Sequence, residues 1–302
     1  MANNIDDLHV LSFKDTITHL CQQKDSRFMM AVDSMRSTGE GAQAVQNLAP
    51  GDMAALTAPT YAGALNDDGW YGDTEWDQAE HFQRWVYPSA FKRALPVHRN
   101  NLVQSLTDPK SAYAENIVNA FNRKKDDIII AAALGNAKQG PYDNQADIAL
   151  PTGQKIAAGG TGLLLSKVED AWGRLMAAEC DEDEMWLAVN AKGMSQLKAQ
   201  DQVVSADYNT NRILSGTGKV DTWNGFKLIQ TERLPIATNV VSGFAFTAGA
   251  LKLALWRDLE VRVDERSDKN YTWQIYGDTL LGAVRAEDSR VVQIDFDQSV
   301  AV

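Results

Sequence analysis

Two glycine-containing patterns resemble nucleotide-binding loops. Residues 39–44 read GEGAQA, the letters of a dinucleotide-binding fingerprint, and Gly218-Lys219 resembles the end of a phosphate-binding loop. No apolar strand precedes the first pattern. In the second, Ile213 replaces the first glycine and Val220 replaces the Ser or Thr that would bind magnesium. We therefore interpret the first pattern as a flexible linker and the second as a turn between strands.

Other reactive residue types lack partners at a useful spacing. Ser195 and Lys198 are spaced like a serine–lysine nucleophile pair, but its companion motifs are absent. The acidic run ECDEDE at 179–184 lacks the ligand spacing and glycine of a calcium loop, so we interpret it as a solvated turn. Metal-ligand spacing is also absent among the histidines, which are His9, His19, His81 and His98. We predict no catalytic residue, no metal site and no cofactor.

Composition narrows the class of protein. The 302 residues contain only two cysteines, Cys21 and Cys180, which suits a reducing compartment and argues against a disulfide-framed domain. No run approaches the roughly 20 apolar residues that a membrane helix needs. We therefore expect a soluble protein made inside the cell. The net charge of −11 disfavours general affinity for nucleic acid or anionic lipid.

Charge is divided sharply between two neighbouring segments. Residues 49–80 contain no Lys or Arg, and their acidic residues are Asp52, Asp67, Asp68, Asp73, Glu75, Asp77 and Glu80. Residues 81–107 contain no acidic residue, and their basic residues are Arg84, Lys92, Arg93 and Arg99. The turn-rich NDDGWYGD at 66–73 lies within the acidic segment, and we predict a long hairpin or extended loop from about 53 to 99.

Aromatic residues in this region indicate a protein contact. Those of the basic segment, which would also suit a stacking platform for single-stranded nucleic acid, are Phe82, Trp85, Tyr87 and Phe91. The acidic remainder of the chain favours protein over nucleic acid as the partner. Trp70 and Tyr71 at the acidic turn support the same interpretation, because aromatic residues are enriched at protein interfaces.

A long helix is predicted at 108–134. Asp108 is a good N-cap, Pro109 fits the first helical position and Gly135 provides a stop. About 25 residues would form a rod of roughly 37 Å. Its expected buried face consists of Tyr113, Ile117, Phe121, Ile128 and Ala132, flanked by Ala114, Val118, Lys125 and Ile129. We expect NRKKDD at 122–127 to face solvent.

The remaining chain divides into three parts. Residues 6–36 are loosely helical in pattern, and the small, polar segment 37–48 is predicted to be a mobile connector. Helical and strand-like segments alternate from about 150 to 255, which indicates an α+β module. From 256 the pattern alternates with period two in LEVRVDE, YTWQIYGDTLLGAVRA and RVVQIDF, which predicts an antiparallel meander.

This order of elements resembles the major capsid protein fold of tailed bacteriophages. Residues 107–137, TDPKSAYAENIVNAFNRKKDDIIIAAALGNA, resemble its spine helix. SADYNT, TERLP and the stretch from Arg262 to Phe296 resemble the matching axial and C-terminal peripheral segments. The likeness runs in order from about residue 50 to near the end of the chain.

The resemblance implies an α+β capsid-type fold with an N-terminal arm, an extended loop, a peripheral domain and an inserted axial domain. The arm would span 1–48 and the loop 49–105. The peripheral domain would comprise 106–149, with the spine helix, and the strands of 256–302. The axial α+β domain would span 150–255.

The resemblance also implies a function and a set of partners. Copies would assemble as hexamers and pentamers into an icosahedral shell around double-stranded DNA, without sequence-specific binding and without a membrane. A scaffolding protein, a portal and a decoration protein are the implied partners. The shell would be assembled in the bacterial cytoplasm and become the virion capsid. Two alternatives stay open, namely an encapsulin-type compartment shell and a cytosolic α+β enzyme.

Contacts between copies are predicted from the charge division. We expect Arg84, Lys92 or Arg93 to reach acidic groups of an adjacent subunit, and Trp70 and Tyr71 to lie in a contact. We also expect residues 1–48 and the loop to make few contacts with their own core. The acidic candidates cluster at strand ends and a turn of the meander, and they are Glu260, Asp264, Glu265 and Asp268.

Overall fold

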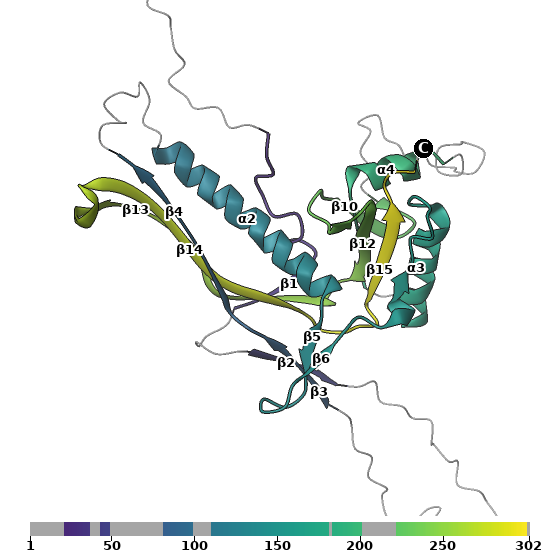
Figure 1. The fold of residues 1–302 in the computed structure, drawn as a ribbon. Coiled ribbons are helices and arrows are strands. Elements are labelled where there is room, and N and C mark those ends of the chain that lie inside the picture. Colours follow the sequence, from purple (N-terminus) through teal and green to yellow (C-terminus); the bar gives the residue numbers. More distant parts are fainter. Residues whose placement is uncertain are drawn as a thin grey trace, which may run out of the picture.

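The structure is a computed structural model that describes residues 21–36, 43–48, 81–98, 110–180, 183–200 and 222–300. In the described part, a long sheet crossed by a helix adjoins a second, more compact unit (Figure 1). Most of the N-terminal arm and residues 49–80 lie outside the described residues. Among the described helices, none combines the length and the apolarity that a membrane crossing requires.

The long sheet has four strands in the order β1-β13-β14-β4. β13 and β14 form an antiparallel hairpin, which confirms the alternation read from LEVRVDE and YTWQIYGDTLLGAVRA. The short 3₁₀ turn η3 (Ser267–Lys269) joins them. β4 pairs antiparallel with β14, and β1 pairs parallel with β13. The bounds are β1 (Asp33–Arg36), β4 (Ser89–Val97), β13 (Leu251–Arg266) and β14 (Thr272–Arg285).

The predicted long helix is confirmed as one continuous element, α2 (Lys110–Leu134), which crosses the long sheet (Figure 1). Ile117 and Phe121 are buried, and Ile128 is partly buried. At the crossing the helix approaches the backbone of Gly277 on β14. A Cβ atom there would lie 2.8 Å from Cγ2 of Ile117 and 3.1 Å from Cε2 of Phe121. A side chain at 277 would therefore push the helix off the sheet.

Two details of α2 differ from the sequence interpretation. Tyr113, expected on the buried face, is 38% exposed. Asp126, expected in solvent with the rest of NRKKDD, is completely buried. The run NRKKDD therefore contains one charged side chain, that of Asp126, which is buried because residues 23–27 cover it.

The compact unit is built on a seven-stranded sheet with the order β7-β15-β12-β8-β10-β9, and β11 pairs with β12. Its strands are β7 (Lys155–Ile156), β8 (Met185–Val189), β9 (Thr222–Trp223), β10 (Phe226–Gln230), β11 (Ile236–Ala237), β12 (Val240–Thr247) and β15 (Val291–Asp297). The 3₁₀ turn η2 (Thr152–Gln154) and the helices α3 (Leu165–Ala177) and α4 (Ala191–Lys198) complete it. Helices and strands alternate here as predicted.

The last strand corrects one expectation. RVVQIDF was interpreted as a continuation of the meander, but β15 pairs with β12, with Val241 opposite Phe296. Val291, Val292, Ile294 and Phe296 are all buried in the core of the compact unit. The chain crosses from the long sheet to the seven-stranded sheet between β14 and β15.

A third sheet has the order β2-β3-β5-β6, and its strands β2 and β3 flank residues 49–80 in the sequence. β2 pairs antiparallel with β3, so the hairpin begins before the residue-53 start read from the sequence. β3 also pairs with β5, which follows α2 directly. The bounds are β2 (Gln43–Leu48), β3 (His81–Val86), β5 (Ala137–Gln139) and β6 (Ala146–Ile148).

The described parts of the arm and loop are more firmly attached than expected. Phe28 is completely buried, and its ring stacks on Phe244 with centroids 5.7 Å apart. β4 pairs with β14 over its whole length. The expectation of few contacts with the subunit's own core is therefore wrong for residues 21–36 and 89–97.

Candidate functional site

Arg84, a predicted contact residue, points into its own chain. It lies on β3 at the base of the loop, is 6% exposed, and donates from Nη2 to Oδ2 of Asp288 at 2.7 Å. Asp288 also accepts from Nε of Arg285 at 2.5 Å. Among the described residues, the Nη1 atom of Arg84 is buried without a hydrogen-bond partner. The charge of Arg84 is thus used within the subunit, which corrects its assignment to an adjacent one.

Arg285 ties this pair to the end of the long helix. It is completely buried, and its Nη1 atom donates to the carbonyl oxygens of Ala133 at 3.0 Å and Gly135 at 2.6 Å. Its Nη2 atom donates to the carbonyl oxygen of Ile148 at 3.1 Å. A cation suits a helix C-terminus, where the last carbonyls lack partners within the helix.

Lys92 and Arg93 are exposed on β4, which is an edge strand of the long sheet. Lys92 lies opposite Asp278 in the strand register, and Asp278 lies opposite Glu260. Asp278 forms its ion pair with Arg257, at 2.7 Å. Neither Lys92 nor Arg93 forms an ion pair with another residue of the described ranges. Because they are consecutive on the strand, their side chains lie on opposite faces of the sheet.

The acidic candidates lie on the outer half of β13 and in the turn after it, and all are exposed. Glu260 pairs with Arg262 at 2.6 Å, and Asp268 pairs with Arg266 at 2.7 Å. Hydrogen bonds from Arg266 lower the pKa of Asp268 to about 2. A cation from another copy would therefore compete with arginines that are already in place. Asp264 and Glu265 lie between these pairs in the sequence.

The aromatic residues do not form one continuous platform. Trp85 packs edge-on against Tyr142 with ring centroids 5.4 Å apart, and its Nε1 atom donates to the carbonyl oxygen of Gly140 at 2.6 Å. Phe91 is partly buried, and Nζ of Lys124 lies 5.0 Å from its ring centroid. Tyr142, which sequence reasoning missed, is 69% exposed. Its position after Gly140-Pro141, in a turn, was the available signal. Trp70 and Tyr71 lie outside the described residues.

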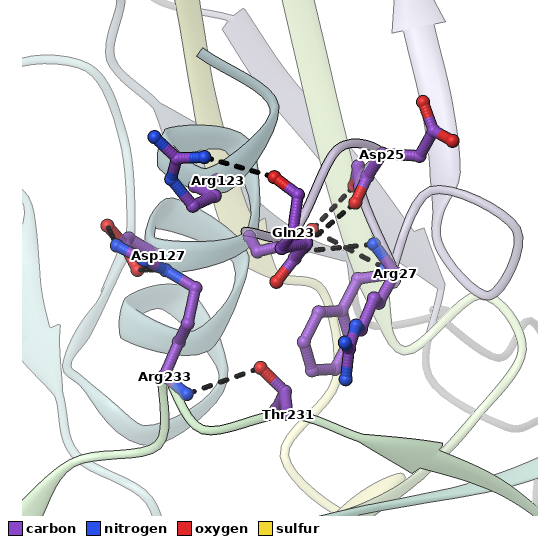
Figure 2. A network of polar contacts seen from close by, with 10 residues as sticks. Gln23, Asp25, Arg27, Arg123, Asp127, Thr231 and Arg233 are labelled. Carbon is purple, nitrogen blue, oxygen red and sulfur yellow. Dashed lines mark hydrogen bonds and ion pairs between the residues drawn. The ribbon is translucent and has the colours of Figure 1, made fainter. Parts of the chain in front are cut away.

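The buried carboxylate of Asp126 binds the arm. Ser26 Oγ donates to it at 2.5 Å, the backbone N–H of Arg27 donates at 3.1 Å, and Gln23 Nε2 donates as well. Figure 2 shows the segment around Gln23 and Arg27 beside the helix that carries Arg123 and Asp127. Asp127 faces the other way and pairs with Arg233, with Nε and Oδ1 2.5 Å apart.

The residue patterns that suggested chemistry are engaged in ordinary contacts where the structure describes them. Ser195 Oγ donates to the carbonyl oxygen of Lys192 at 2.7 Å within α4. In the acidic run, Asp183 pairs with Arg290 and Glu184 pairs with Lys227. Within the described ranges, no three His, Cys, Asp or Glu side chains lie close enough to share a metal ion. The glycine-containing patterns fall largely or wholly outside those ranges.

A family model described as phage capsid protein matches residues 5–298. Among curated protein sequences, none matches this chain significantly. The matched residues include all three sheets and the helices α2, α3 and α4.

Solved structures share the fold at low sequence identity. A structure titled Mycobacterium phage Che8 matches with a TM-score of 0.70 and 14% identity over 100% of each chain. The capsid of Helicobacter pylori bacteriophage KHP30 matches with a TM-score of 0.70 and 13% identity, over 98% of this chain and 97% of that one. The capsid of a native gene transfer agent particle matches with a TM-score of 0.67 and 14% identity, over 98% of this chain and 97% of that one. The fold of the whole chain is therefore a phage capsid fold.

Proposed function

This chain belongs to the phage capsid protein family, and we propose that its copies assemble as hexamers and pentamers into the icosahedral shell of a tailed bacteriophage. The match of the family model over residues 5–298 is the observation that carries the proposal. The shell would enclose double-stranded DNA without reading its sequence. The net charge of −11 suits this role, because an acidic wall does not grip the packaged polyanion.

The architecture supports a tile-like subunit. We propose that α2 and the long sheet form the peripheral domain, and that the seven-stranded sheet with α3 and α4 forms the axial domain (Figure 1). The axial unit would then run from about residue 150 and include β15, while the peripheral strands would begin with β13 at Leu251. Residues 1–48 and 49–105 remain the proposed arm and extended loop, with β4 as the loop's attachment to the peripheral sheet.

Contacts between copies are proposed for the exposed charges. Lys92 and Arg93 on β4 would approach Glu260, Asp264, Glu265 and Asp268 at the β13–β14 tip of an adjacent subunit. Because Arg262 and Arg266 already bind two of these carboxylates, each pair would contribute little, about 0–1 kcal/mol. A closed shell repeats each contact in every subunit, and weak contacts let misplaced subunits detach. Trp70 and Tyr71 are proposed as contact residues of the loop.

Other proposed partners follow from the family. A scaffolding protein and a portal would take part in assembly in the bacterial cytoplasm, and a decoration protein could bind the finished shell. No chemical step is proposed for Ser195, Cys21, Cys180, His81 or His98.

The proposal is tested by purifying particles from cells that express this chain together with its neighbouring phage genes. We expect electron microscopy to show closed shells with five-fold and six-fold clusters of this chain, and nuclease-resistant double-stranded DNA inside filled ones. Closed shells that never package DNA and instead hold a protein cargo would favour the encapsulin-type alternative. A soluble monomer under every condition, with no shell built from it, would contradict the proposal.

A further inference from the structure

Asp126 is a completely buried carboxylate in the middle of the long helix. A buried charge is costly unless hydrogen bonds compensate for the lost water. Within the described chain, every group that donates to it belongs to residues 23–28, about one hundred positions earlier. The carboxylate therefore depends on this segment of the arm, and the segment is held by the carboxylate.

Neighbouring contacts hold the same segment on both sides of Asp126. Arg123 donates from Nη1 to Oε1 of Gln22 at 2.9 Å and to the carbonyl oxygen of Gln23 at 3.0 Å. Figure 2 shows Arg123 directed at this part of the arm. Asn122 Nδ2 donates to the carbonyl oxygen of Lys24 at 2.9 Å. These contacts fix the backbone of residues 22–28 along the side of the helix.

The segment continues into the core and then into the long sheet. Phe28 is completely buried against Phe244 and Phe246. Five residues later β1 begins, and it adds a short parallel strand to the edge of β13 with Asp33 opposite Lys252. A four-residue strand has little stability alone, and an uncovered sheet edge invites wrong pairing. The arm must therefore be positioned before β1 can cover this edge.

We infer that Asp126 is a positioning residue for assembly, because its carboxylate fixes the arm on the helix and thereby fixes where the arm leaves the subunit and where β1 pairs. The arm is then organised by the subunit itself before any neighbour arrives. A subunit without the carboxylate folds its helix and its sheets but has a released arm and an uncovered β13 edge. The role of Asp126 in assembly rests on the proposed shell function, whereas its role in anchoring the arm does not.

The anchor is tested first on isolated subunits with Asp126→Asn, which nearly preserves size but removes the charge and turns an amide N–H₂ toward the donors. We expect hydrogen exchange in residues 22–36 to be about 10- to 100-fold faster than in the wild type, since bonds to a charged acceptor are lost. Trypsin should cut after Lys24 and Arg27 correspondingly faster. Protection of the helix α3 should not change.

Asp127→Asn is the matched control, because it removes the next carboxylate of the same helix and its pair with Arg233, and Asp127 forms no hydrogen bond or ion pair with residues 21–36. We expect no change in the arm's exchange in this variant. If Asp126→Asn fails to fold, the arm-side variant Gln23→Ala with Ser26→Ala removes two donors and should loosen residues 22–36 in the same way. Equal exchange of residues 22–36 in wild type and variants, or equal loss of protection throughout the chain, would overturn the inference.

Particle yield tests the second half of the inference. We expect Asp126→Asn subunits to give several-fold fewer closed particles and more aggregate than Asp127→Asn subunits. A loosened arm with normal particle yield would leave the anchor intact and overturn its role in assembly. A failure of the wild-type chain to form shells would instead overturn the proposed function, and the exchange result would stand.

Discussion

The guanidinium group of Arg84 lies 2.7 Å from the carboxylate of Asp288, a residue 204 positions further along the chain. The same carboxylate accepts from Arg285, which in turn binds the last carbonyls of the long helix. One carboxylate therefore joins β3 to the helix and to the end of β14. Arg84 and Arg285, both buried, share the carboxylate of Asp288. Removing Asp288 should therefore lower the stability of the subunit by a different amount from removing one of the arginines.

Asp288→Ala should destabilise the subunit more than Arg84→Met does. The first leaves two buried guanidinium groups without their anion, and we expect a cost of about 3–5 kcal/mol in the free energy of unfolding. The second leaves Asp288 paired with Arg285, so we expect about 1–3 kcal/mol. Urea unfolding of isolated subunits measures both. Equal costs, or the reverse order, would show that Asp288 is not the shared anion of the junction.

Gly277→Ala should separate α2 from the long sheet. Because the added Cβ would lie 2.8 Å from Cγ2 of Ile117, we expect a loss of about 1–3 kcal/mol from overpacking. In the double variant with Ile117→Ala the combined loss should be smaller than the sum of the two single losses. Gly173→Ala is the control, since nothing lies within 4 Å of a Cβ there, and it should be neutral or stabilising. Additive losses in the double variant would contradict the close approach.

The sequence predicted elements whose signals are local. The helix from Lys110 to Leu134 has a stop at Gly135 and apolar residues at helical spacing, and the β13–β14 hairpin has a period-two pattern interrupted by two register shifts. The sequence did not predict that β15 joins the seven-stranded sheet, because an alternating pattern does not reveal which sheet a strand joins.

Buried charges were missed for a related reason. Asp126 stands in a charged run and looks solvated, and Arg84 looks like one cation of an exposed segment. Their burial depends on Ser26, Arg27 and Asp288, which lie about one hundred to two hundred positions away. A single sequence does not show such pairings, whereas local spacing and turn residues are visible in it.

Cys180 should react much more slowly than Cys21 with an alkylating reagent. Cys21 is exposed, whereas Cys180 is buried, and burial raises the pKa of its thiol. Because the thiolate is the reactive form, a raised pKa keeps Cys180 protonated near neutral pH, and its rate should rise only as pH passes through that raised pKa. Mass spectrometry of native subunits labelled over a pH series measures both rates. Unfolded chains should label both cysteines alike; equal rates in the native subunit would contradict the burial of Cys180.

Reversing the charges of the β4 edge should impair assembly without unfolding the subunit. Lys92 and Arg93 are exposed and form no ion pair with another described residue, although Lys92 lies opposite Asp278. Lys92→Glu with Arg93→Glu should therefore cost only about 0.2–1 kcal/mol in the free energy of unfolding, through the like charges at 92 and 278, and leave the subunit folded. If these cations approach the acidic β13–β14 tip of an adjacent copy, the yield of closed particles should fall. Added salt should slow the early assembly of the wild type in the same direction, because it screens exposed charges.

A control and a charge swap separate this contact from net charge. Lys155→Glu with Lys192→Glu makes the same change in net charge at two exposed lysines of the compact unit. If that control lowers particle yield equally, net charge rather than the β4 edge is responsible. The swap adds Glu260→Lys to the reversed β4 variant. Because Glu260 is bound by Arg262 in its own chain, the new lysine would repel that arginine and leave two cations facing the reversed edge. Glu260 and Lys92 both flank Asp278 in the same sheet, so the unfolding free energy of each variant is measured as well. Recovery of particle yield in the swapped variant without a gain in that free energy, and no recovery when Glu287→Lys is added instead, would place the β4 edge against the tip of the neighbouring hairpin.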